Sequence, residues 1–194
     1  MIEKFSYHSD AAINQHGVAK YSLNENSHAP FQKAIDDVVA GSTPLGYVRM
    51  GKTPDVLKML GLPDVPLTIN GATIEKVMAQ HLGLAKGEHS NIHNLTPDTL
   101  RQLPKQLNNP VAVFKSGTDA TKQGYVVLTE LTEKDIKTGM DKPVIAALHV
   151  KTTNKGLELI NIGSVYGKDS LKSIQNSLDK DLLYWHKEKG QNFV

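Results

Sequence analysis

The sequence predicts an α+β fold in which N-terminal helices pack on a four- to five-stranded antiparallel sheet. Up to about residue 108, apolar side chains recur at helical spacing. Beyond Pro110 the spacing changes to the β-branched runs and alternation typical of strands. Because helices and strands fill separate halves, the pattern argues against alternating, parallel βαβ units.

Helices are expected where apolar residues share one helical face between a start signal and a stop signal. Thr53 and Thr96 each precede a Pro-Asp pair, a pattern typical of an N-cap followed by Pro at the first helical position. The predicted helices are Phe31–Val39, one after Thr53 ending at Gly61, Ile74–His81, one after Thr96 ending before Asn108, and Leu171–Leu178.

Strands are expected where short apolar or alternating runs lie between clusters of Gly, Asn, Asp and Lys. The predicted strands of the sheet are Val111–Ser116, Tyr125–Glu130, Val144–Lys151 and Leu157–Tyr166, with Leu182–His186 as a last strand. Tyr47–Met50 and Leu67–Ile69 are expected as brief extended pieces among the helices.

The first 29 residues are polar, and we expect them to form a flexible arm or linker. Residues 30–194 are then expected to form a single domain, because a chain of 194 residues is long enough for one sizeable core.

Composition excludes several classes of protein. Twenty-two Lys and Arg against 20 Asp and Glu give a formal charge of +2, which permits an RNA substrate but is far from a protein that coats nucleic acid. The absence of cysteine excludes disulfides, zinc–thiolate sites, iron–sulfur clusters and thiol nucleophiles. No apolar run approaches the roughly 20 residues that cross a bilayer, so neither a membrane partner nor a signal peptide is expected.

Residues 46–53 match the phosphate-binding pattern G-x-x-x-x-G-K-[ST] letter for letter. A phosphate-binding loop needs a buried strand that leads into its first glycine and small residues whose amides turn inward. Here the residues inside the pattern are bulky and strand-prone, from Tyr47 to Met50. We therefore interpret the match as coincidental and expect no nucleotide cofactor.

His81, His89 and His93 cluster around a polar loop. His89 and His93 have the i, i+4 spacing that can bind a metal, but the Glu of H-E-x-x-H is missing. Exposed loop histidines and a catalytic imidazole that needs no metal are the other two interpretations. No metal is expected.

Hydroxyl and basic side chains on the predicted strands form a second candidate group: Ser116, Thr129, Ser164, Tyr166, Lys115 and Lys168. The period of two puts Ser164 and Tyr166 on one face of their strand. Together with an imidazole, such groups could hold a phosphodiester and stabilise its transition state. The simpler interpretation is that the hydroxyls belong to an ordinary antiparallel sheet and Tyr166 only packs.

Several segments in order resemble a known family. They are residues 51–57 and 60–67, Leu103–Pro104, residues 109–116, residues 127–131 and residues 161–168. Together they resemble the phage and prophage domain at the C-terminus of MuF-type capsid proteins and inside large polyvalent phage proteins. That family is grouped with the barnase–EndoU–colicin–RelE-like (BECR) nucleases. The resemblance covers roughly residues 45–188.

The resemblance implies a BECR-like nuclease fold and a metal-independent endoribonuclease, in which the 2′-hydroxyl attacks the adjacent phosphate. The family's catalytic His falls on His93 or His81, Ser116 closes the first strand of the sheet, and Ser164 and Tyr166 lie on the fourth. Lys115, Lys168 and Thr129 are the expected substrate-binding residues.

The resemblance also implies a toxin or effector of phage or prophage origin whose substrate is RNA, with tRNA favoured, and whose partner is a cognate immunity protein or antitoxin. It would act in the cytoplasm of a target bacterium, delivered by a phage particle or a secretion system. A non-catalytic phage structural or host-interaction module with the same fold is the main alternative. A deaminase or another enzyme acting on a phosphate-containing ligand is the third.

Overall fold

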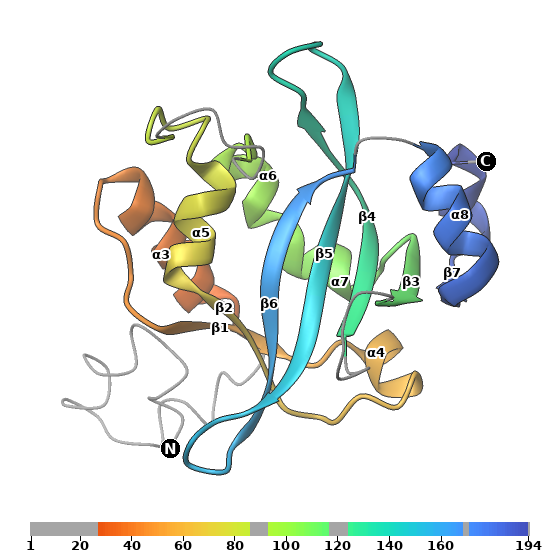
Figure 1. Cartoon of the computed structure of the whole chain (residues 1–194). Coiled ribbons are helices and arrows are strands. Elements are labelled where there is room, and N and C mark those ends of the chain that lie inside the picture. The colour runs from red at the N-terminus through yellow and green to blue at the C-terminus, as the bar shows by residue number, and fades with distance from the viewer. Residues whose placement is uncertain (1–26, 86–92, 117–123, 169–170, 194) are drawn as a thin grey trace. The chain divides into compact units, whose positions relative to one another are not determined.

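The computed structural model describes residues 27–85, 93–116, 124–168 and 171–193 and has an α+β fold (Figure 1). The chain-order elements are α3 (Ala29–Val39), β1 (Tyr47–Lys52), α4 (Asp55–Met59), β2 (Pro66–Asn70), α5 (Gly71–Met78), α6 (Pro97–Arg101), α7 (Leu103–Asn108), β3 (Ala112–Lys115), β4 (Gly124–Lys134), β5 (Asp141–Thr152), β6 (Glu158–Gly167), α8 (Leu171–Asp181), β7 (Leu182–Trp185), α9 (Lys187–Gly190) and the 3₁₀ helix η2 (Gln191–Phe193).

The sheet differs from the predicted one in size and in direction. It has seven strands in the order β1-β2-β6-β5-β4-β3-β7, and β2 pairs with β6 in parallel. The prediction of four to five antiparallel strands is therefore wrong. The two N-terminal extended pieces were recognised as extended but not as members of the sheet, because hydrophobic spacing identifies a strand without identifying its partner.

The chain divides into two compact units, and each is described by itself. The first comprises residues 1–76 and 150–162, and the second comprises residues 77–149 and 163–194. The predicted arm lies outside the described residues up to residue 26, and Ala29 already begins α3. The arm and the single domain stay predictions.

In the first unit, α3 packs its apolar face on β1. Phe31, Ala34, Ile35 and Val38 are buried, which confirms the helix predicted from their spacing. β1 pairs antiparallel with β2, and β2 pairs with the first half of β6 from Leu67 opposite Ile160 onward.

Thr53 does not cap α4 as predicted. The N-cap position of that helix is Pro54, with no side-chain cap. The Thr53 hydroxyl instead donates to the carbonyls of Pro63 and Val65, at 2.7 Å and 3.0 Å, and is buried. The loop before β2 thus competes successfully for the hydroxyl that the sequence pattern assigns to the helix.

The G-x-x-x-x-G-K-T letters lie along a strand. β1 runs from Tyr47 to Lys52, so the residues between the two glycines are extended and do not form a loop around an anion. The strand predicted at Tyr47–Met50 is confirmed, and the absence of a nucleotide cofactor stays a prediction.

In the second unit, the predicted helix after Thr96 is two helices. Thr96 is the N-cap as predicted, with its hydroxyl accepting from the N–H of Thr99 at 3.1 Å. The break falls at Gln102, between α6 and α7. Pro104 explains it, because proline donates no N–H and its ring crowds the carbonyl four residues earlier.

The second unit contains β3, most of β4 and β5 as one long hairpin, and β7, all joined antiparallel (Figure 1). An apolar cluster lies on this part of the sheet and includes Ile174 from α8. The other buried members are Val111, Ala112, Phe114, Leu128 and Ile145. Within the described ranges, no helix is long and apolar enough to cross a membrane.

Candidate functional site

The rings of His93 and Tyr166 are in contact in the second unit. Their centroids are 5.4 Å apart and the ring planes differ by 20°, which is a stacked arrangement. Both side chains are half-buried. Stacked aromatic pairs at such separations contribute about 0.5–1.5 kcal/mol beyond the burial of their area. The stack therefore fixes the plane of the imidazole while part of its surface stays exposed.

Tyr166 is held by the sheet beneath it. The N–H of Lys168, two residues after Tyr166, donates to the carbonyl of Pro143 on β5 at 2.8 Å. On the same sheet, Ile145 of β5 lies opposite Leu128 of β4. Tyr166 packs against the apolar cluster that contains both of these residues, and one face of its ring thereby rests on the core.

Ser164 and Lys168 lie two residues to either side of Tyr166. Side chains two apart on a strand point to the same face and lie roughly 7 Å apart, so Ser164 shares the face of Tyr166. Lys168 follows the end of β6 and is half-buried. Among the described residues, no carboxylate is paired with its ammonium group.

His93 is positioned by backbone hydrogen bonds to the end of α5 and the turn that follows. The N–H of Gln80 donates to the carbonyl of His93 at 3.2 Å, and the N–H of Leu95 donates to the carbonyl of Val77 at 3.0 Å. Leu95 is fully buried. The segment that carries His93 is therefore anchored at the histidine itself and at Leu95, two residues after it.

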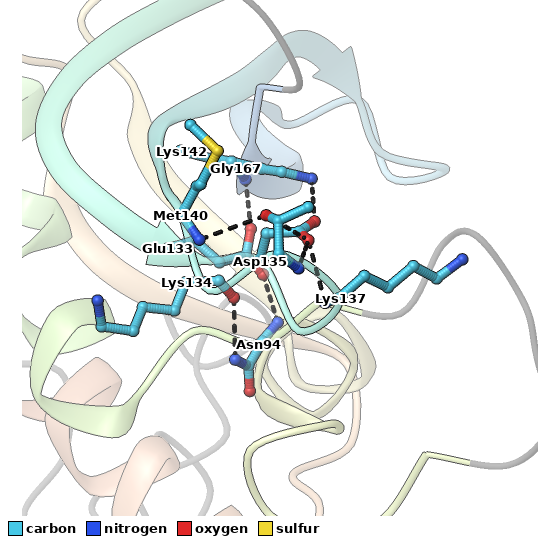
Figure 2. Close-up of polar contacts among 9 residues, drawn as sticks. Asn94, Glu133, Lys134, Asp135, Lys137, Met140, Lys142 and Gly167 are labelled. Atoms are coloured by element: carbon cyan, nitrogen blue, oxygen red, sulfur yellow. Dashed lines mark hydrogen bonds and ion pairs between the residues drawn. The ribbon is translucent and has the colours of Figure 1, made fainter.

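A carboxylate joins the histidine segment to the strand of Tyr166 (Figure 2). Glu133, on β4, accepts the N–H of Asn94 on Oε1 and the N–H of Gly167 on Oε2. Its exposed fraction is only 7%. Asn94 adds a bond from its side-chain amide to the carbonyl of Lys134 at 3.1 Å. Glu133 thus binds the residues that directly follow His93 and Tyr166.

Gly167 is a glycine because of this close approach. A Cβ at this position would lie 2.7 Å from Oε2 of Glu133 and 2.8 Å from Cβ of Lys142. Both distances are too short for any larger residue without displacing these neighbours.

A second carboxylate organises the turn of the β4–β5 hairpin. Asp135 forms an ion pair with Lys142 and accepts the N–H groups of Lys137 and Thr138 and the Thr138 hydroxyl. The Lys142 hydrogen bond, followed by the bonds from Thr138, holds the pKa of Asp135 well below its usual 3.8. The Lys142 ammonium thus pairs with Asp135, and the Glu133 oxygens accept the backbone N–H groups of Asn94 and Gly167.

Lys115 lies on the other face of the sheet. Phe114 belongs to the cluster on which Tyr166 packs, and successive side chains of a strand alternate, so Lys115 points away from it. Its ammonium group lies 4.7 Å from the centre of the Tyr125 ring, a cation–π contact.

Ser116 is also distant from Tyr166. Its N–H donates to the carbonyl of Gly124 at 3.0 Å, at the far end of β4 from Leu128. Ser116 is four residues beyond Ala112, the β3 residue opposite Leu128, or roughly 13 Å along the strand. The structure does not bring Ser116 to the histidine–tyrosine pair.

Thr129 is fully buried and its hydroxyl is occupied. Oγ1 donates to the carbonyl of Val144 at 2.7 Å and accepts the N–H of Leu131 at 3.2 Å. The pairing of β4 with β5 shifts register between Leu128 and Thr132, so this hydroxyl satisfies backbone groups at an irregularity of the sheet.

Of the other histidines, His81 is exposed in the turn after α5 and makes no ring contact or hydrogen bond with a described residue. His89 lies outside the described residues. No group of three or more His, Asp or Glu that could hold a metal occurs among the residues that the structure describes.

Glu133 was missed in the sequence because the predicted strand ended at Glu130. β4 continues to Lys134, and its burial alternates regularly from Glu130 onward, with Leu131 and Glu133 inside. Extending the strand period of two from Leu131 to Glu133 would have indicated this in the sequence. It places a carboxylate on the side of the strand where an apolar residue is expected, which calls for a hydrogen-bonding partner.

The geometry defines an α+β protein with a half-buried histidine–tyrosine pair held on a sheet. The family described as the phage MuF-C-terminal domain matches residues 84–192, more than half of the 194 residues. The chain therefore belongs to this family, and the phage MuF part of the resemblance is confirmed. His93, Glu133 and Tyr166 lie within the matched range, and His81 lies before it. Searches of curated proteins and of solved structures gave no match.

Proposed function

We propose that this MuF C-terminal domain is a metal-independent endoribonuclease related to the BECR nucleases, with its active site at His93 and Tyr166. The observation that carries the proposal is the stack of these two rings, with Ser164 and Lys168 on either side of the tyrosine. An imidazole can serve in general acid–base catalysis, and two hydroxyls and an ammonium group can stabilise the charge on a phosphate, so RNA could be cleaved here without a metal.

In the proposed reaction the 2′-hydroxyl of a nucleotide loses its proton to the neutral imidazole of His93. The 2′-oxygen then attacks the adjacent phosphorus, and the bond from phosphorus to the 5′-oxygen of the next nucleotide breaks. The leaving 5′-oxygen takes up a proton from water, the protonated His93 returns its proton to the solvent, and the products are a 2′,3′-cyclic phosphate and a 5′-hydroxyl end. General acid–base help of this kind is typically worth about 10²- to 10⁴-fold in rate.

The other side chains stabilise the charge that develops on phosphorus. Lys168 offers a positive charge beside the strand, and the hydroxyls of Ser164 and Tyr166 offer hydrogen bonds to the phosphate oxygens. Thr129, Lys115, Ser116 and His81 are left out of this site because of where they lie.

The biological setting is part of the proposal. The domain would act as a phage or prophage effector on structured RNA, with tRNA favoured, inside a target bacterium. A chain that cuts its host's RNA also calls for a neutralising immunity protein or antitoxin.

The decisive experiment incubates the purified chain with bacterial RNA in excess chelator and maps the new ends. The expected products carry 2′,3′-cyclic phosphate and 5′-hydroxyl groups. Replacing the ribose at one mapped site by 2′-deoxyribose should abolish cleavage there only. Folded wild-type protein that leaves total bacterial RNA intact would instead support the non-catalytic phage module.

A further inference from the structure

Glu133 connects the two halves of the histidine–tyrosine pair. Its carboxylate oxygens accept one backbone N–H each, from Asn94 and from Gly167 (Figure 2). These donors belong to the residues directly after His93 and Tyr166. The residues that follow both rings therefore bind one side chain, which lies on β4, separated from β6 by β5 in the sheet.

We propose that Glu133 is a positioning residue that holds the His93 ring in register on Tyr166 and thereby sets the geometry of the reaction. This inference rests on the proposed function for its kinetic consequence. The structural part of the proposal, that Glu133 holds the His93 ring on Tyr166, can be tested whether or not the protein cuts RNA.

The chemistry of the contact favours such a role. Hydrogen bonds to an ionised carboxylate are roughly twice as strong as neutral ones, and this carboxylate is almost completely buried, so water competes poorly for the two amides. Lys142, which lies opposite Glu133 in the pairing of β4 with β5, forms an ion pair with Asp135. The close contact with Gly167 leaves the carboxylate little room to shift.

Replacement of Glu133 by glutamine changes the hydrogen-bonding groups of the side chain with little change in its size. Glutamine has the same shape but presents one acceptor oxygen and one NH₂ group. Two converging N–H donors cannot both be satisfied by it, so one amide loses its partner. Displacements near 1 Å in a catalytic arrangement can cost about 100-fold in rate.

The test compares Glu133→Gln with Asp135→Asn in the full chain. Asp135 lies on the same hairpin and its carboxylate also binds backbone N–H groups, but these belong to Lys137 and Thr138, which adjoin neither His93 nor Tyr166. It is thus a control for general loss of hairpin stability. Each variant is measured for RNA cleavage, for amide hydrogen exchange at Asn94 and Gly167, and for the NMR shifts of the His93 ring protons, which sense the Tyr166 ring current.

We expect Glu133→Gln to lower kcat about 10- to 100-fold with little change in KM. Exchange at Asn94 or Gly167 should accelerate, and the His93 ring protons should move toward random-coil shifts. Asp135→Asn should leave all three close to wild type. In a His93→Ala background, Glu133→Gln should cost no further activity, because it acts through the histidine.

Unchanged His93 ring shifts and unchanged exchange in folded Glu133→Gln would overturn the proposal. So would a loss of activity that remains undiminished in the His93→Ala background. If wild type cuts no RNA, the proposed function fails while the ring shifts and exchange still decide whether Glu133 positions the pair. Glu133→Gln that does not fold is replaced by Glu133→Asp, whose shorter side chain should release one amide and move the same signals.

Discussion

The imidazole of His93 stacks on the phenol ring of Tyr166 although the histidine precedes α6 and the tyrosine lies near the end of β6. A loop histidine needs an external support to hold one orientation. Here the support is an aromatic ring that itself rests on the apolar cluster of the second unit. The arrangement makes the imidazole both oriented and half-exposed, which is what the proposed proton transfer from a bound substrate needs.

Replacing His93 by alanine should abolish RNA cleavage, with a loss of at least about 10²-fold. The free energy of unfolding should fall only slightly, because the ring is half-buried and the backbone bonds of its segment are retained. Cleavage assays and urea denaturation measure the two effects. His81→Ala is the matched control and should keep wild-type activity; the reverse result would move the catalytic role to His81.

Substitutions at Tyr166 can separate its ring from its hydroxyl. Tyr166→Phe keeps the stack and the packing, so the His93 ring shifts should stay, while cleavage should fall about 10-fold if the hydroxyl bonds the phosphate. Tyr166→Leu removes the stack as well and should cost more activity. Equal activities of wild type and Tyr166→Phe would restrict the role of Tyr166 to supporting the imidazole.

Local patterns in the sequence predicted the helices and strands well. The apolar faces of α3 and of the segments around Leu100 and Leu107 are buried as their spacing requires. Both bonds of the Thr96 hydroxyl go to Thr99 in the first turn of its own helix, whereas the loop before β2 takes the hydroxyl of Thr53. The difference lies in tertiary contacts that a local pattern does not contain.

The candidate site could be predicted only in part for the same reason. Strand alternation put Ser164 and Tyr166 on one face, and a polar loop with histidines was visible. The pairing of β3 with β4 decides that Ser116 lies far from Tyr166, and no residue spacing reveals that register. Glu133 binds segments that are distant in sequence on both sides, so its partners emerge only from the fold.

Thr129→Val should destabilise the protein without a specific effect on cleavage. The substitution keeps the shape of the side chain but leaves the carbonyl of Val144 and the N–H of Leu131 without the hydroxyl that serves both. Buried groups left unsatisfied cost about 1–3 kcal/mol, measurable by urea denaturation. A fully folded Thr129→Val protein with greatly reduced cleavage would return Thr129 to the substrate-binding residues.

Asp135→Asn should change how stability depends on pH. The pKa of Asp135 is lowered from 3.8 in the folded state, chiefly by Lys142 and then by Thr138, so folding favours the ionised carboxylate. Its contribution is complete above the unfolded pKa and is lost as the pH falls through the lower, folded pKa. Asp135→Asn should therefore be less stable than wild type near neutral pH, and the difference in melting temperature should shrink below about pH 4. A difference that stays constant down to pH 2 would contradict this account.

Gly167→Ala should disturb the site through lack of space. The new methyl group would meet Oε2 of Glu133 at 2.7 Å and Cβ of Lys142 at 2.8 Å, so the carboxylate, the lysine or the end of β6 must move. Overpacking of this kind typically costs about 1–3 kcal/mol, and displacement of Glu133 should also shift the His93 ring signals in NMR spectra. Gly163→Ala is the matched control on the same strand, because its methyl group would come no closer than 3.3 Å, to Cδ2 of His149. Gly163→Ala should lose less stability and keep the His93 shifts. If the two variants proved equally stable, with His93 shifts identical to those of wild type, the tight contact between Gly167 and Glu133 would not be what holds the pair.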